Sequence, residues 1–192
     1  MFRLESPGYW VFEKILPEKV CDAITEIGES VLPQIGQIGD PDNSDTNTEF
    51  RNSSISWIDP TSWVAGLCAH FFNAANVNSK WNIALDYTES PQFTEYQQGQ
   101  FYAFHTDSQV ARKKDGLQRK LSLSIQLTEK TEYEGGVLRF KNFGEEEIYT
   151  EPAFEHKGSV IVFPSHVQHE VTKITKGTRK ALVTWCHGPE WR

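Results

Sequence analysis

Apolar residues recur at helical spacing in two segments of the first 80 residues. Over residues 17–31 they return every three or four positions, which predicts an amphipathic helix with an apolar face of Val20, Ile24, Ile27 and Val31. Residues 61–75 predict a second helix, whose apolar side consists of Trp63, Leu67, Phe71 and Phe72. Between them, residues 37–55 are rich in Gly, Asp, Asn, Ser and Thr, a composition that predicts a long loop.

From residue 81 onward the pattern changes to short β-branched or aromatic segments divided by Gly, Pro and polar turns. These segments predict strands at residues 81–87, 93–98, 100–107, 120–127, 135–140, 159–164, 169–174 and 180–185. A count of about eight strands is typical of a jelly roll. The sequence therefore predicts an α+β, mainly β fold in a single domain over residues 1–192. Its double-stranded β-helix (jelly-roll) core spans residues 81–189, with N-terminal helices from residues 1–80 packed on one sheet.

Composition and charge narrow the class of protein. A length of 192 residues, with 38% hydrophobic residues and twelve Phe, is ordinary for a globular domain rich in β structure. The net charge of −7 offers no electrostatic reason to bind nucleic acid or an anionic membrane, so neither is expected as a partner. Cys21, Cys68 and Cys186 form no CxxC pair and are odd in number, which indicates neither a disulfide framework nor a zinc ribbon. Without a signal peptide or a run of ~20 apolar residues, the expected location is cytoplasmic.

Two polar residues interrupt an aromatic, strand-like segment at residues 101–108. His105 and Asp107 are two positions apart, and side chains at that spacing project from the same face of a strand. They could therefore reach one metal ion together. A strand with a solvated polar face explains most such tripeptides equally well, so the metal interpretation needs a third ligand.

Candidates for that ligand follow the apolar strand at residues 160–163. His166 and His169 come shortly after it, and either could instead be a structural histidine. Ten residues beyond His169, Arg179 shares a predicted strand face with Ala181, Val183 and Trp185. An inward-facing arginine must be paired because a buried, unpaired charge is very costly, and its natural partner is a carboxylate of the protein or of a ligand.

Two histidines and one carboxylate form the facial triad of non-haem Fe(II) oxygenases. With an arginine beyond it, the chain resembles the 2-oxoglutarate (2OG)- and Fe(II)-dependent dioxygenases. Within these it is most similar to the prolyl hydroxylase-like branch, the type of the prolyl 4-hydroxylase alpha-subunit catalytic domain. The resemblance covers roughly residues 10–189 and is most specific over 93–189. It rests on the segments FTEYQQGQFYAFHTD, YEGGVLRF, GSVIVFPSHVQHEV and GTRKALVTWCHGP.

The resemblance implies roles for individual residues. The iron ligands would be His105, Asp107 and His169. The 2OG-binding residues would be Arg179, for the distal carboxylate, and Tyr96. Gln126 stands where some relatives carry a 2OG-binding tyrosine, so that contact would pass to an amide. The substrate pocket would include Tyr102 and Trp185. Both tyrosines are equally compatible with packing in the core.

The resemblance also implies the reaction. O2 and 2OG would be consumed, a substrate C–H bond hydroxylated, and succinate and CO2 released, with Fe(II) as cofactor and ascorbate as a further family expectation. A peptidyl proline is the favoured substrate, while free amino acids and other protein side chains stay open. The basic run at residues 109–120, with Arg112 as its candidate substrate contact, is either a solvated loop or a lid that attracts an acidic peptide. The loop at residues 39–54 is either a second flap or a spacer.

Two other classes of function fit part of the pattern. A jelly-roll binding module could hold a structural zinc ion, which normally takes a closed set of four ligands, with His166 as the candidate fourth. A cupin-type metalloenzyme that does not use 2OG is the other alternative, and it leaves Arg179 without an assigned partner.

Overall fold

Two antiparallel β-sheets face each other in the computed structural model, which describes residues 8–36, 48–109, 116–141 and 147–190. The larger sheet has seven strands in the order β1 (Trp10–Phe12), β11 (Val160–Pro164), β7 (Leu117–Gln126), β14 (Arg179–Pro189), β5 (Gln92–Tyr96), β4 (Ser54–Trp57) and β2 (Gln34–Ile35). The smaller sheet has five, in the order β10 (Ile148–Tyr149), β9 (Leu138–Lys141), β12 (Gln168–Val171), β6 (Phe101–His105) and β3 (Arg51–Asn52). Every pairing between neighbouring strands is antiparallel.

The remaining elements are short or lie outside the two sheets. A two-stranded ribbon pairs β13 (Ile174–Gly177) with β8 (Tyr133–Gly135). Within the described ranges, the 3-10 turns are η1 (Asp107–Gln109), η2 (Lys130–Glu132) and η3 (Pro152–Glu155). The α-helices in these ranges are α1 (Glu18–Ser30) and α2 (Trp63–Asn78).

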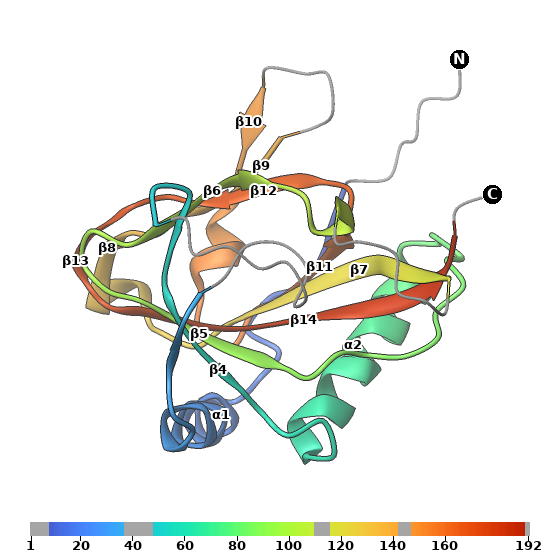
Figure 1. The fold of residues 1–192 in the computed structure, drawn as a ribbon, viewed down its shortest axis with the longest axis horizontal. Helices are drawn as coiled ribbons and strands as arrows, with labels where there is room; N and C mark the ends of the chain where they lie inside the picture. The colour runs from blue at the N-terminus through green and yellow to red at the C-terminus, as the bar shows by residue number, and fades with distance from the viewer. Residues whose placement is uncertain (1–7, 37–47, 110–115, 142–146, 191–192) are drawn as a thin grey trace.

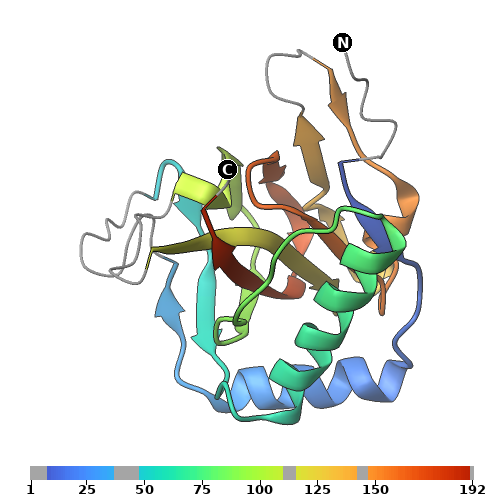
Figure 2. The same ribbon diagram turned by 90° about the vertical axis from the view of Figure 1, so that its right-hand side faces the viewer.

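Both helices cover the outer face of the seven-stranded sheet, as Figures 1 and 2 show. α1 contacts β4, and α2 contacts β7, β11 and β14. Their buried apolar residues join the core of that sheet, in a cluster that includes Ile24, Phe71, Phe72, Leu121 and Leu182. The predicted mainly β jelly-roll fold with helices on one sheet is confirmed.

The second helix turns a slightly different face inward than the sequence predicts. Trp63 is 50% exposed, whereas Val64 and Cys68 are fully buried. The buried row runs through positions 64, 68, 71, 72 and 75, so the true stripe begins one residue later than the aromatic pattern indicates.

Three strand predictions and one loop prediction need correction. Residues 81–87 form no strand, although this segment hydrogen-bonds along the end of β14, from Asp86 N to His187 O (2.7 Å) and from His187 N to Tyr87 O (2.7 Å). Residues 51–55, predicted as loop, lie largely in β3 and β4 because cross-strand pairing with β6 and β5 outweighs their turn-forming composition. Residues 135–140 are divided between β8 and β9, and residues 169–174 between β12 and β13. The loop at 39–54 lies outside the described residues up to position 47.

No described helix combines the length and the apolar character needed to cross a membrane. A second apolar cluster, with Tyr96, Phe140 and Phe163 among its members, fills part of the space between the two sheets. The functional candidates line the rest of that space.

Candidate active site between the two sheets

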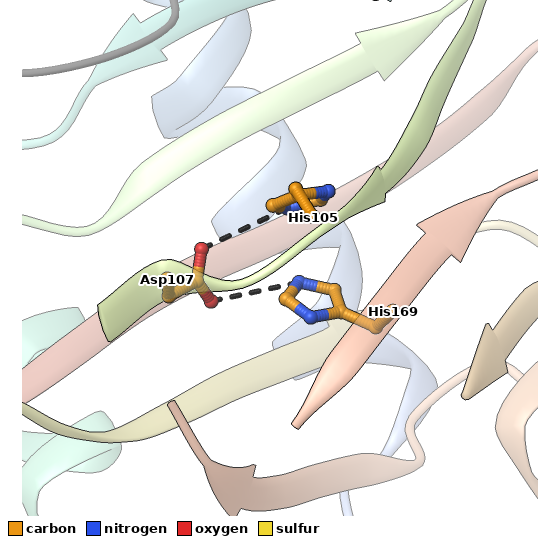
Figure 3. Close-up of side chains that lie close together, drawn as sticks. All are labelled: His105, Asp107 and His169. Atoms are coloured by element: carbon orange, nitrogen blue, oxygen red, sulfur yellow. Dashed lines mark ion pairs between the residues drawn. The ribbon is translucent and has the colours of Figure 1, made fainter. Parts of the chain in front are cut away.

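Three candidate metal ligands meet at one point between the sheets (Figure 3). His105 ends β6 and is the antiparallel partner of His169 on β12. Their Nε2 atoms lie 3.7 Å and 3.5 Å from the two carboxylate oxygens of Asp107. One ligand atom from each residue falls within 4.8 Å of the others, close enough for all three to bind one ion.

Asp107 reaches this point by a route that strand alternation does not describe. β6 ends at His105, and Asp107 begins the 3-10 turn η1. The turn is anchored because the backbone N–H groups of Asp107 and Ser108 donate to the Ser165 carbonyl at 2.9 and 3.0 Å. The prediction that His105 and Asp107 converge was right, but its reason, a shared strand face, was wrong.

Backbone carbonyls set the orientation of both imidazoles. His105 Nδ1 lies 2.8 Å from the Ala103 carbonyl, and His169 Nδ1 lies 3.1 Å from the Val167 carbonyl. Since a carbonyl only accepts, each Nδ1 is the donor, and in the neutral imidazole this tautomer leaves a lone pair on Nε2. These lone pairs are the ones that face Asp107, so both histidines are prepared as metal ligands.

The Asp107 carboxylate is fixed by a pair of buried serines. Ser122 Oγ donates to Asp107 Oδ2 at 2.6 Å, and Ser165 Oγ lies 3.0 Å from Ser122 Oγ. The sequence predictions did not include these serines. The Leu-Ser-Leu-Ser alternation in β7 was the available signal, because it turns small polar groups toward one face.

The protonation states suit a divalent cation. Burial alone would raise the pKa of Asp107, but the two histidines, a nearby arginine and the Ser122 hydrogen bond lower it to about 2. Burial lowers the pKa of His105 to about 3, and the neighbouring His169 acts in the same direction. An anionic carboxylate and neutral imidazoles are the forms that metals bind. Two imidazoles and one carboxylate therefore fit Fe(II) in a facial arrangement.

His166 does not complete a closed metal site. Among the described residues the cluster has three members, and His166 is exposed and lies outside it. The four-ligand zinc alternative therefore has no support from His166.

The cluster opens into a cavity of about 610 Å³ that is lined by both sheets. The cavity-lining residues of β14 include Arg179, Ala181, Val183 and Trp185, the set that strand alternation predicts. Arg179 is 2% exposed, and its guanidinium carbon lies 5.9 Å from the centre of the Tyr96 ring. Within the described part of the chain, no carboxylate forms an ion pair with Arg179. A buried cation in such a setting favours an anionic ligand.

The other predicted site residues fall in three different places. Tyr96, Tyr102 and Trp185 line the cavity. Gln126 is fully buried but does not line it, and its amide donates instead to the Thr128 carbonyl (2.9 Å) and the Tyr133 hydroxyl (3.0 Å). Arg112 lies outside the described residues, as do the other residues of 110–115 in the basic run at 109–120.

A second charged group in the cavity was missed. Arg119, which the sequence assigns to the basic run, lies on β7 and forms a bidentate pair with Glu89 at 2.6 and 2.7 Å. Its guanidinium carbon lies 3.7 Å from the centre of the Trp185 ring, and His187 Nε2 contacts the same carboxylate. Burial would raise the pKa of Glu89, but the hydrogen bonds from Arg119 and His187 lower it to about 2. The carboxylate comes from the irregular segment before β5, where no pattern signals it.

The chain is similar in sequence to known oxygenases and hydroxylases. The family model for the 2OG-Fe(II) oxygenase superfamily matches residues 91–187, just over half of the chain. The chain is 37% identical over 99 residues to a PKHD-type hydroxylase of Alteromonas mediterranea, covering 50% of this chain and 42% of that protein. It is 33% identical over 149 residues to a PKHD-type hydroxylase of Shewanella oneidensis, covering 72% and 61%. The chain thus spans only part of the length of these relatives.

Solved structures share the fold at lower identity. A prolyl-4-hydroxylase of Pseudomonas putida superimposes with a TM-score of 0.70 at 21% identity, over 94% of this chain and 93% of that one. A prolyl hydroxylase of Trichoplax adhaerens, solved in complex with a peptide fragment of the hypoxia inducible factor oxygen degradation domain, gives 0.73 at 18% identity, over 95% and 84%. The family model also spans the three clustered residues and Arg179. By this match the chain belongs to the 2OG-Fe(II) oxygenase superfamily.

Proposed function

We propose that the protein is a 2OG- and Fe(II)-dependent dioxygenase that hydroxylates a C–H bond, with succinate and CO2 as by-products. One observation carries this proposal: a cavity holds both a His-Asp-His cluster and a buried arginine that has no carboxylate partner among the described residues. A metal-binding cluster alone is compatible with other classes. The arginine supplies the reason to expect an acidic co-substrate beside the metal.

Each of these residues has a distinct task in the proposed reaction. His105, Asp107 and His169 hold Fe(II), which when bound supplies the oxidative chemistry with O2 and 2OG. Arg179 binds the distal carboxylate of 2OG, with Tyr96 as the wall beside it. Gln126 stays in the proposal only as a support of the β7 end, because its amide is already used by Thr128 and Tyr133.

We propose a peptidyl proline as the substrate. The similar structures named above are prolyl hydroxylases, and one of them holds a peptide. Here, Tyr102 and Trp185 offer aromatic faces to an apolar ring. Arg119 uses its Nε and Nη2 atoms for Glu89, which leaves further N–H donors of the guanidinium for a peptide carbonyl.

Two further expectations belong to this proposal. Ascorbate would reduce the iron back to Fe(II) after it is oxidised in turnover that does not hydroxylate a substrate. The location would be cytoplasmic, and the three free, buried cysteines support a reducing compartment.

Peptide oxidation tests this function. Proline-containing peptides would be incubated with the Fe(II)-loaded protein, 2OG and isotopically labelled dioxygen, and analysed by mass spectrometry. The proposal predicts one labelled oxygen atom on a proline residue, in step with succinate, and neither product with Asp107→Ala. Succinate formation with oxidation at another residue type would refute the proline assignment alone. An iron-loaded protein whose peptide oxidation does not require 2OG would favour the cupin-type alternative.

A further inference from the structure

The two metal-binding histidines have unequal surroundings. His169 is packed by Phe163, at 4.7 Å between ring centres, and by Phe140, at 6.2 Å. His105 instead stacks on Tyr102, with ring centres 3.5 Å apart and planes inclined by 14°. The guanidinium carbon of Arg51 lies 4.7 Å from the centre of the same tyrosine ring. A cation, a phenol ring and an imidazole thus follow one another toward the metal site.

Arg51 is held in this position from both sheets. It lies on β3 as the antiparallel partner of Tyr102 on β6, and it is 7% exposed. Its Nη2 donates to Gln92 Oε1 at 2.8 Å, on β5 of the opposite sheet, and its Nε donates to Ser53 Oγ at 3.1 Å. Gly36 lies so close to Arg51 that a Cβ atom added to this glycine would be 2.7 Å from Arg51 Nε. The guanidinium is therefore fixed rather than free to follow the tyrosine.

Phe50 packs against the Tyr102 ring as well. Its ring meets Tyr102 edge to face, with centres 6.0 Å apart and planes inclined by 82°. The tyrosine is consequently confined by Phe50, Arg51 and His105 together. A ring confined in this way can transmit its orientation to the imidazole stacked on it.

We propose that Arg51 is a positioning residue for the metal site, acting through Tyr102 on the imidazole of His105. The inference rests on the proposed function only in requiring that His105 binds a metal. The single hydrogen bond from His105 Nδ1 to Ala103 O fixes one atom of the ring, which leaves rotation about that bond. Stacking on Tyr102 fixes the ring plane, so that Nε2 faces Asp107 at 3.7 Å. Arg51 holds Tyr102 in turn.

Cobalt titration tests the proposal, because Co(II) is a spectroscopic substitute for Fe(II) that needs no turnover. Outer-shell partners of metal ligands typically contribute about 10- to 100-fold to metal affinity. Arg51→Met should therefore weaken Co(II) binding by about tenfold or more and shift the imidazole NMR signals of His105 in the metal-free protein. Arg51→Lys, which keeps a cation, should recover part of both. The matched control is Arg139→Met, which removes an arginine paired with Glu170 on the same sheet and should change neither.

A second pair of variants keeps the test decisive if Arg51→Met does not fold. Tyr102→Phe retains the ring and should keep the parent affinity for Co(II), whereas Tyr102→Leu should lose affinity as Arg51→Met does. Equal Co(II) affinity and unchanged His105 signals in Arg51→Met, or equal affinities for the two Tyr102 variants, would overturn the positioning role. A parent protein that binds no Co(II) at all would instead refute the metal site of the proposed function, and the positioning role with it.

Discussion

The two sheets contribute different chemistry to the same cavity, and they hold it in place by different means. The five-stranded sheet supplies His105 and His169, each oriented by a backbone carbonyl two residues earlier in the chain. The seven-stranded sheet supplies Arg179, which is buried and has no carboxylate partner among the described residues, and the half-buried Arg119, whose partner Glu89 is 30 positions away. The two imidazoles are thus oriented by local contacts, whereas the two arginines depend on burial and on distant partners. The two sides should therefore respond differently to mutation.

The largest effect is expected on the arginine side, at Glu89. Glu89→Gln removes the charge partner of the half-buried Arg119 and should destabilise the fold by roughly 3 kcal/mol at neutral pH, the value that a pKa lowered from 4.5 to about 2 implies. The folded-state pKa is below the unfolded one, so this stabilisation is complete above pH ~4.5 and is lost as the pH falls toward about 2.

Urea unfolding of the parent and Glu89→Gln between pH 7 and pH 3 measures this difference. The difference between the free energies of unfolding of the two proteins should be constant down to pH ~4.5 and should narrow below it. Glu134→Gln is the matched control, because its pair with Lys176 is solvent-exposed and should contribute almost nothing. A difference in free energy of unfolding that does not change with pH would contradict the assigned role of the Glu89 charge.

The second-largest effect is expected on 2OG affinity, without a change in metal affinity. Arg179→Gln should weaken 2OG binding by about 10- to 100-fold, because a hydrogen bond to a charged group contributes about 1.5–3 kcal/mol. Co(II) affinity should not change, since Arg179 contacts none of the three ligands. Lys180→Gln is the neighbouring control: Lys180 pairs with Glu29 outside the cavity, so its loss should alter neither quantity. Equal 2OG affinity in Arg179→Gln and parent would remove the arginine from the co-substrate site.

The smallest effect is expected on the metal side. Ser122→Ala removes the 2.6 Å hydrogen bond to Asp107 and should weaken Co(II) binding by about tenfold while leaving 2OG affinity per bound metal unchanged. Ser124→Ala, on the same cavity-lining face of β7, is the control. If both serine variants bind Co(II) equally, the serine pair does not orient the carboxylate.

The contrast between local and distant contacts also explains which site residues could be predicted from the sequence. His105 and Arg179 could be predicted because residue type and strand period are local properties of the chain, whereas the choice of His169 over His166 came from the family resemblance. Glu89 was not, since its partner Arg119 is 30 positions away and its own segment is irregular. Arg51 was missed for another reason: its turn-forming neighbours conceal a strand that pairing with β6 stabilises. Contacts between distant segments require the fold before they can be seen.

Asp107 shows how a correct prediction can rest on an incorrect geometry. The period of a strand predicted that it would join His105, but the chain leaves the strand and uses a 3-10 turn anchored on Ser165. In the same way, aromatic residues predicted the α2 face one position early, because packing on the sheet selected Val64 rather than Trp63. Residue chemistry was read correctly in both cases, and the backbone path was decided by tertiary contacts.

The central claim is that the His-Asp-His cluster and Arg179 together bind Fe(II) and 2OG. Anaerobic titration of the Fe(II)-loaded protein with 2OG tests it most directly, because a keto acid that chelates iron at an open facial site gives a weak visible charge-transfer band near ~500 nm. The account predicts that this band appears and saturates with the parent, needs far more 2OG with Arg179→Gln, and is lost with Asp107→Ala. A fully iron-loaded parent that develops no band at any 2OG concentration would contradict it.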